Sequence, residues 1–470
     1  MTDMENSFKE RGSVRLLYGW LVFAVSALVF AGVFAFLIAG ARTPYIMRLF
    51  SDAGYVRRAL VGHVILSFII WFLAFEGALW TLAATDFLKK ALFSLALGWA
   101  GLASGAAGML LVIWTSLLGL GRPVFINYIP VLETPVFYAG LSLLALGMLA
   151  TLVNSVLTMM KAAAEESRAF YRLVRFGLAV SGVSVFVALI CFGLSFLSYT
   201  AAGEDISRID LEAFFWGGGH MLQFANTIAM VSAWLYLARN VFKTAPIRSA
   251  YGLPAFALFG AFVAAAPLIY IFYGIGSPGY RYAFTKLMQW GLGPSTGVFA
   301  IAVVSAIRTG TGNRLPWKNP EFSSLIASMA LFAMGGVISF TIGGYNTKIP
   351  AHYHGVIGAV TVSFMGMTYY LIKALGREIY SPWLASIQPY VYGIGQALFV
   401  IGMFWAGSRG VARKSFGAAQ GLDDPVKVLS MIVFGLGGLV AITGGVMFVL
   451  NAGISLLRRR PGRVAAGDMG

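Results

Sequence analysis

The segment IPAHYHGV, residues 349–356, places two histidines inside an apolar run and decides how the rest of the chain is interpreted. On an α-helix, His352 and His354 differ by about 200° and point to opposite sides. They therefore cannot chelate one ion, but each can bind one of two metals that flank the helix. Neutral imidazole is a common ligand of transition metals and of heme iron. The alternative is that one or both are hydrogen-bonded core histidines.

The composition around this segment is that of a membrane protein. Of 470 residues, 59% are hydrophobic and 11% are charged, with a mean hydropathy of +0.80. Soluble domains contain about 25% charged residues, so this chain cannot cover a water-facing surface of normal size. We predict an all-α integral membrane bundle of twelve helices, each close to the ~20 residues that cross a bilayer. The predicted spans are 17–40, 59–83, 91–120, 136–160, 172–199, 212–238, 250–275, 285–307, 322–344, 351–375, 386–407 and 429–456.

The distribution of basic residues predicts the topology. Lysine and arginine are more frequent in the segments that an N-in, C-in arrangement places in the cytoplasm, so the net charge of +16 is a topology signal rather than a sign of nucleic-acid binding. We expect a cytoplasmic N-tail (1–16), a twelve-helix transmembrane domain (17–456) and a cytoplasmic C-tail (457–470). The outer loop 200–212 is acidic, which suits a cationic electron donor such as a small cytochrome, and equally an ordinary solvated loop. Its acidic residues are Glu204, Asp205, Asp210 and Glu212.

The four histidines fall at one depth in this topology. His63, His220 and the pair His352 and His354 lie in the first third of spans that run from outside to inside. Ionisable residues inside a membrane are rare and are functional candidates by default. The single cysteine, Cys191, excludes a disulfide, a CxxCH heme attachment and a dicysteine copper centre within this chain.

Several stretches together carry a resemblance to a known family. GHVILSFIIWFL (62–73) is similar to a helix that carries a low-spin heme ligand, and FFWGGGHMLQF (214–224) to a helix that carries the first active-site copper ligand. Residues 340–344 and AHYH (351–354) resemble the end of the ninth helix and the HxH tenth helix. With twelve spans, the chain resembles subunit I of the heme-copper oxidase superfamily, which includes cytochrome c oxidases and nitric oxide reductases.

The resemblance implies two hemes of b or a type. His63 and His354 would bind a low-spin heme from two sides, and His352 would be the proximal ligand of a high-spin heme. A six-coordinate iron only passes electrons, whereas a five-coordinate iron keeps a site open for O2 or NO. The open face would look toward His220, and the candidate catalytic residues are His220 and Tyr280.

A basic segment after the eleventh span is the predicted partner of the heme propionates. It reads SRGVARKSFGAAQGL (408–422), and arginine forks suit carboxylates. The resemblance points to Arg413 and Lys414, with Arg409 nearby; the alternative is an ordinary charged loop. It also implies a bacterial or archaeal inner membrane and partner respiratory subunits, among them a cytochrome c or cupredoxin-type subunit.

The chain departs from this family at the second metal. The family's copper needs three imidazoles, one from the sixth span and a His-His pair at the outer end of the seventh. Three of the four histidines here would bind hemes, which leaves His220, and Gly279-Tyr280 stand where the pair would be. One imidazole, helped at most by Met221 and Tyr280, does not make a stable copper site. We therefore expect no normal copper, with His220 as a residual second-metal ligand.

Other functional positions of the family differ as well. Phe224 stands where many members have a redox tyrosine, and no proton-path lysine is evident in residues 293–302. The non-heme iron of nitric oxide reductases usually needs a glutamate, but the sixth span has no acidic residue after Glu212. The three glycines 217–219 before the sixth-span histidine would permit close approach of a porphyrin or of another helix.

Glu76 is the one acidic residue well inside a predicted span. It lies 13 residues past His63, which is about 20 Å along a regular helix and a rotation of about 220°, away from the heme face. It either belongs to a proton path, or pairs with a neighbouring helix or the inner headgroup water.

These observations lead to one expected function and two alternatives. We expect a membrane di-heme oxidoreductase subunit that passes electrons from the low-spin heme to a high-spin heme that binds O2 or an N-oxide. The first alternative is a non-catalytic subunit that relays electrons or senses gas within a larger respiratory complex. The second is a heme-free transporter, against which the placement of the histidines argues.

Overall fold

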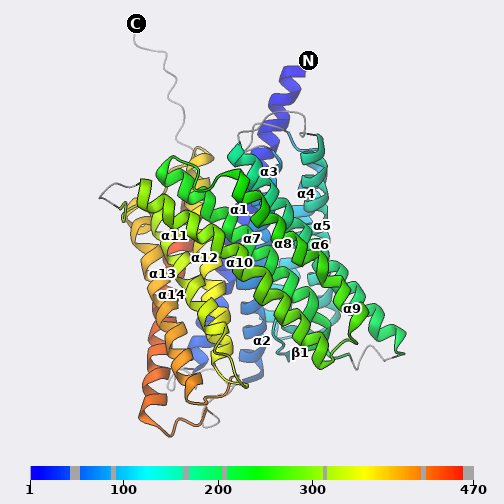
Figure 1. The fold of residues 1–470 in the computed structure, drawn as a ribbon, viewed down its shortest axis with the longest axis vertical. Helices are drawn as coiled ribbons and strands as arrows, with labels where there is room; N and C mark the ends of the chain where they lie inside the picture. The colour runs from blue at the N-terminus through cyan, green and yellow to red at the C-terminus, as the bar shows by residue number, and fades with distance from the viewer. Residues whose placement is uncertain are drawn as a thin grey trace.

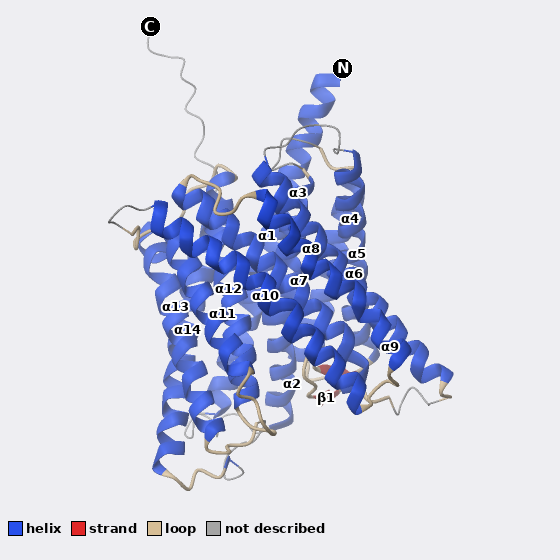
Figure 2. Ribbon diagram, in the orientation of Figure 1, coloured by secondary structure: helices blue, strands red, loops and turns tan. Residues whose placement is uncertain are grey.

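The computed structural model describes residues 2–42, 53–85, 91–161, 169–203, 209–310, 315–413 and 420–458, and it is a bundle of long helices (Figures 1 and 2). Within these ranges, twelve helical segments are long and apolar enough to cross a membrane, as the sequence predicted. Ten spans are built on single helices: α1 (Thr2–Arg42), α4 (Leu95–Leu117), α5 (Pro135–Lys161), α6 (Ala169–Ala201), α7 (Leu211–Phe242), α10 (Pro278–Gly310), α11 (Pro320–Ser339), α12 (Lys348–Ala374), α13 (Pro382–Ser408) and α14 (Pro425–Leu457). The seventh span combines α8 (Ser249–Ala265), the 3₁₀ turn η4 (Ala266–Leu268) and α9 (Ile269–Phe272).

The second span contains a π-helix, which the sequence analysis did not predict. It runs through α2 (Ala53–Val64), η2 (Ile65–Ile70) and α3 (Trp71–Ala84), and η2 is the π-helical part. A π-helical turn holds one residue more than an α-helical turn, so residues beyond it are turned back by about 100°. The expected 220° rotation between His63 and Glu76 was therefore wrong, because it assumed a regular helix; about 120° remains.

The three histidine-bearing spans form the centre of the bundle. In the most apolar stretch of each of these spans, 78% of the residues are buried for the second span, 94% for α7 and 83% for α12, against at most 50% for every other described span. All three spans begin at one end of the bundle, so their histidines lie in the first turns from that end (Figure 1). The central position is what a cofactor site inside the bundle requires.

A short β-hairpin marks that end of the molecule and departs from the all-α expectation. Strand β1 (Arg122–Val124) pairs antiparallel with β2 (Val131–Glu133) between α4 and α5, with Arg122 opposite Glu133. The Arg122 side chain donates to the Glu133 carboxylate at 2.6 Å, and this hydrogen bond lowers the pKa of Glu133. We call this end the hairpin end. The opposite end, where α1 begins and α14 ends, is the termini end (Figure 1).

Some predicted boundaries moved. The eighth span begins at Pro278 rather than at residue 285, because proline suits the first helical turn. The ninth ends at Ser339 rather than at residue 344. Helix α1 begins at Thr2, so most of the predicted N-tail is helical, and residues 459–470 of the predicted C-tail lie outside the described residues.

Helices α13 and α14 pack backbone against backbone. Four glycines leave room for this, because a Cβ atom at any of them would overlap main-chain atoms of the other helix. Small residues let membrane helices approach closely in the absence of a hydrophobic driving force. We call Gly395, Gly402, Gly437 and Gly444 the glycine seam.

The seam predicts opposite effects for two adjacent substitutions. A Cβ at Gly444 would lie 2.5 Å from the main-chain nitrogen of Tyr392, whereas nothing lies within 4 Å of a Cβ at Gly445. We expect Gly444→Ala to lower the stability of the detergent-solubilised chain by about 1–3 kcal/mol through overpacking. Gly445→Ala should be neutral or stabilise by up to about 1 kcal/mol, since alanine is the better helix former. Thermal unfolding midpoints test this, and equal losses in both variants would contradict the seam.

Candidate functional site

Two histidines are tied to carbonyl oxygens of neighbouring helices. His63 Nδ1 lies 2.9 Å from the oxygen of Ala31 on α1, and His352 Nδ1 lies 2.8 Å from the oxygen of Gly335 on α11. A carbonyl oxygen only accepts, so each Nδ1 carries the hydrogen and each Nε2 keeps its lone pair. Metal-ligating histidines are usually oriented in this way. The hydrogen bond of His352 requires α11 and α12 to lie close together. Two glycines allow this, because a Cβ at Gly335 or Gly355 would meet main-chain atoms of the other helix at about 3 Å.

His354 turns to different neighbours from His352. Its ring lies edge-to-face on Phe399 of α13, with centroids 4.8 Å apart, and it is close enough to His63 to interact electrostatically. Among the described residues, its side chain has no hydrogen-bond partner. The two imidazoles of α12 therefore contact different helices, α11 for His352 and α13 for His354.

His220 occupies an aromatic pocket on α7. Its Nδ1–H donates to the carbonyl of Trp216 at 2.7 Å, so its Nε2 accepts a hydrogen bond from the Tyr128 hydroxyl at 3.2 Å. Burial and the nearby Glu212 carboxylate raise the pKa of Tyr128, which keeps the phenol protonated and able to donate. Tyr128 lies in the hairpin loop and was not among the predicted site residues. The sequence offers no motif for it, because the contact joins two segments 92 residues apart.

Aromatic side chains pack directly against the three glycines that precede His220. A Cβ at Gly217, Gly218 or Gly219 would overlap, in turn, Tyr270, Phe192 and Tyr128. The sequence left open whether a helix or a porphyrin approaches at this point, and the structure places these rings there.

Tyr280 lies beside this pocket, in the first turn of α10. Its hydroxyl bonds with the Tyr270 hydroxyl at 3.1 Å and with the Ala213 carbonyl at 3.2 Å. The ring of Phe284 lies 5.1 Å from the Tyr280 ring and 5.6 Å from the His220 ring. The structure thus puts Phe284 beside both rings and shows no direct hydrogen bond between Tyr280 and His220.

Of the two described members of the predicted propionate-binding group, Arg413 is buried and Arg409 is exposed. The guanidinium of Arg413 donates to the Asn127 side chain and lies over the Tyr345 ring, 4.5 Å from the centroid. Its Nε is buried and has no hydrogen-bond partner in the described part of the chain. Arg409 instead forms an exposed ion pair with Asp424 at 3.2 Å, and Lys414 lies outside the described residues.

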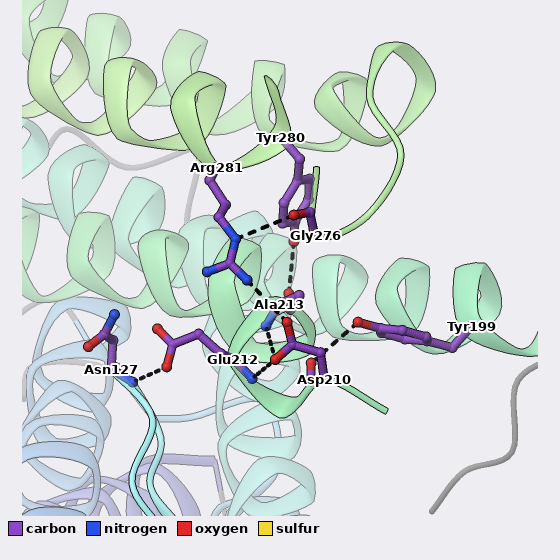
Figure 3. Close-up of polar contacts among 8 residues, drawn as sticks. All are labelled: Asn127, Tyr199, Asp210, Glu212, Ala213, Gly276, Tyr280 and Arg281. Carbon is purple, nitrogen blue, oxygen red and sulfur yellow. Dashed lines mark hydrogen bonds and ion pairs between the residues drawn. The ribbon is translucent and has the colours of Figure 1, made fainter. Parts of the chain in front are cut away.

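The acidic residues at the start of α7, Asp210 and Glu212, form hydrogen bonds and an ion pair within the chain (Figure 3). Asp210 caps the helix by accepting from the main-chain N–H of Glu212 and Ala213, and it pairs with Arg281 at 3.1 Å. Glu212 accepts from the main-chain N–H of Asn127 at 3.0 Å. The other two acidic residues of loop 200–212 lie outside the described residues, so the expected docking of a cationic donor stays a prediction.

His220 is not joined by enough metal-ligating side chains, within the described residues, to form a site with three protein ligands. No group of three or more histidine, cysteine or acidic side chains comes together within the described ranges. Phe224, at the position of the family's redox tyrosine, is buried against Gly291 of α10. Glu76 is fully buried in α3, and neither of its oxygens has a partner among the described residues.

The comparisons with known proteins agree with this architecture. The family model for cytochrome c and quinol oxidase polypeptide I matches residues 15–451. An uncharacterized protein of Rickettsia prowazekii (strain Madrid E) is 25% identical, over 93% of this chain and 95% of its own length. An uncharacterized protein of Aquifex aeolicus (strain VF5) is 28% identical, over 76% and 84%. Cytochrome c oxidase subunit 1 of Thermus thermophilus is 29% identical, but over only 31% of this chain and 28% of that protein.

A solved structure shares the fold over nearly the whole chain. A heme-copper terminal oxidase, determined as a dimer, matches with a TM-score of 0.76 at 19% identity, covering 96% of this chain and 85% of that one. The family match covers ten spans completely and most of the first and the twelfth. The chain therefore belongs to the family of cytochrome c and quinol oxidase polypeptide I, as a multi-pass membrane protein of the oxidoreductase subunit I type.

Proposed function

We propose that this chain is a di-heme subunit that accepts electrons at a low-spin heme and delivers them to a high-spin heme that binds O2 or an N-oxide. One observation carries the proposal. His352 and His354, two residues apart on α12, contact different helices, and His354 is within electrostatic reach of His63. This is the arrangement that two irons on either side of one helix require.

The residues present fit bound heme. A buried polar group without a partner costs about 1–3 kcal/mol, so such groups mark places where another molecule binds. The Nε of Arg413 is such a group, and the half-buried ring of His354 also has no hydrogen-bond partner among the described residues. When bound, heme supplies one-electron transfer and, at a five-coordinate iron, an open position for a small ligand.

The roles of the protein residues follow from their contacts. His63 and His354 would ligate one iron, and the Gly335 carbonyl would hold His352 in the tautomer and orientation that ligate the other. Arg413 would bind a propionate, because its side chain is buried with Nε unpartnered. Lys414 stays in the proposal as its neighbour. Arg409 is a weaker candidate, since Asp424 already neutralises it.

The donor set at His220 does not fit the family's copper, and we assign no step to that metal. The Nε2 of His220 accepts from Tyr128 at 3.2 Å. We propose that His220 and Tyr128 line the open side of the high-spin site and offer a hydrogen bond there. Tyr280 would support this pair from behind Phe284.

The proposal includes an orientation in the membrane and a partner subunit. The termini end would face the cytoplasm of a bacterial or archaeal cell, with 17–456 as the membrane domain and the tails 1–16 and 457–470 inside. A cytochrome c or cupredoxin-type subunit would approach the hairpin end, near the proposed hemes.

The His220–Tyr128 bond also favours the alternative function. A ring nitrogen that is already hydrogen-bonded is not offered to a second metal, and reduction of O2 with one metal is less favourable than with two. The alternative is a subunit that relays electrons or senses a gas without turnover. Ligand binding to the reduced protein separates this from the main proposal.

Substitution of the α12 histidines tests the di-heme assignment. We expect the purified chain to show two heme signals in a reduced-minus-oxidised spectrum, one of which shifts with carbon monoxide. His352→Ala should remove only the CO-reactive signal and His354→Ala only the other, since each imidazole serves one iron. Loss of the same band in both variants would contradict the assignment. Two hemes without a CO shift would favour the relay, and a colourless chain the transporter.

A pair of adjacent glycines tests the orientation of His352. A Cβ at Gly335 would lie 2.9 Å from the carbonyl oxygen of His352, whereas nothing lies within 4 Å of a Cβ at Gly336. We expect Gly335→Ala to push α11 from α12, break the hydrogen bond to His352 and weaken the CO-reactive heme signal. Gly336→Ala is the matched control and should keep the spectrum. An unchanged spectrum in Gly335→Ala would show that this carbonyl does not orient the ligand.

Metal analysis tests the second site. We expect the purified chain to contain iron and only substoichiometric copper, because His220 has Tyr128 rather than two further imidazoles beside its Nε2. Stoichiometric copper that persists after dialysis against a chelator, and that disappears in His220→Ala, would overturn this expectation.

A further inference from the structure

Among the glutamates whose side chains the structure describes, two are completely buried, and their surroundings differ. Glu321, in the first turn of α11, accepts from the side chains of Lys373 and Asn240, which lie on α12 and α7. Glu76, in α3, has no hydrogen bond or ion pair on either oxygen among the described residues. One carboxyl group is therefore matched by a cation, and the other is left without a charge partner.

The position of Glu76 is deep in the bundle. All 14 residues of α3 are buried. Phe75 stacks on Phe364 of α12 at 4.4 Å, and Gly77 faces Trp20 of α1. Trp80 lies one helical turn from Glu76, on the same face of α3, and it approaches Gly182 of α6. Glu76 thus belongs to the side of α3 that packs toward α6.

A second unpartnered group lies on that face. The indole Nε1 of Trp80 is buried and, like the oxygens of Glu76, lacks a hydrogen-bond partner in the described part of the chain. The Trp80 N–H donor and the Glu76 acceptor lie one helical turn apart, and neither has a hydrogen-bond partner in the described part of the chain. Such a pair suits a bridging internal water, which typically makes about three hydrogen bonds.

The neighbouring helices bring no charge to Glu76. Helices α1, α5, α6, α7 and α12 pack against α3, and α14, whose one ionisable side chain is Lys427 near its start, contacts Trp71 through Phe448. Among the side chains that the structure describes, the ionisable ones on the termini side of these helices are Arg11, Arg15, Tyr18, Tyr171, Arg172, Arg175, Tyr236, Arg239, Tyr369, Tyr370 and Lys373, and α5 has none between 139 and 160. On the hairpin side, Cys191, His220, His352 and His354 lie deepest. None of these groups forms a hydrogen bond or an ion pair with Glu76.

An ionised carboxylate in this position would cost several kcal/mol, because it would be neither solvated nor paired. We propose that Glu76 is a proton-binding site of the membrane interior, held as a neutral carboxylic acid and exchanging its proton with water from the termini end. In uptake, hydronium gives its proton to the carboxylate and leaves as water. In release, the carboxyl O–H bond breaks and water takes the proton. This site is independent of the proposed heme ligands.

Carbodiimide labelling of the full chain in its membrane tests the neutral state. Dicyclohexylcarbodiimide is apolar and adds to protonated carboxyl groups, so we expect mass spectrometry to find it on Glu76 and not on the ion-paired Glu321. Glu321 is a matched control within the same molecule, and the result does not depend on any variant folding. Label on Glu321 alone, or on neither glutamate, would overturn the proposal.

Infrared difference spectroscopy tests the exchange. We expect the C=O stretch of a protonated carboxylic acid that shifts in D2O, disappears in Glu76→Gln and persists in Glu321→Gln. Glu76→Gln should keep the elution profile of the wild-type chain, since the amide replaces a neutral acid of similar size. Loss of a carboxylate band in Glu76→Gln would show that Glu76 is ionised. A carboxylic band that does not shift in D2O would show that the site is sealed from water.

Discussion

The hydrogen bond from an imidazole Nδ1–H to a main-chain carbonyl on a neighbouring helix is the interaction on which this site depends. The membrane interior offers no water to satisfy or orient a polar side chain, so each ring nitrogen needs a partner from the protein or from a bound group. The carbonyls of Ala31 and Gly335 supply such partners to His63 and His352. In both cases the bond joins two helices, which couples the direction of the ring to the packing of the bundle.

Polar contacts are concentrated in two layers at the ends of the bundle. At the hairpin end, Asn127 joins Arg413, from the loop after α13, to Glu212 at the start of α7. At the termini end, Glu321 joins α11 to Lys373 on α12 and to α7. Both layers include α7, the most buried of the described spans. Hydrogen bonds to other segments therefore fix this central helix at both of its ends. Between them, the core is apolar apart from the histidines, Glu76 and scattered hydroxyl and amide groups.

Much of the fold could be predicted because hydropathy is a local property. The twelve spans and the positions of the histidines along them follow from composition and spacing alone. The partners of the histidines could not be predicted, because they depend on contacts between distant segments. Tyr128, which bonds to His220, lies in a loop 92 residues earlier in the sequence. Asp210 and Glu212 were predicted to form an acidic surface, but they bind Arg281 and the main chain of Asn127. The roles of the histidines as iron ligands stay predictions.

The π-helix in the second span has a consequence for the descent of this chain. A π-helical turn is one residue inserted into an α-helix, and the insertion rotates everything after it. Here it separates the histidine half of the span from the half that carries Glu76. Homologues whose second span is α-helical throughout would need a one-residue gap inside that helix to be superposed on it. Counting along the chain from His63 would otherwise pair Glu76 with the wrong position of such a homologue.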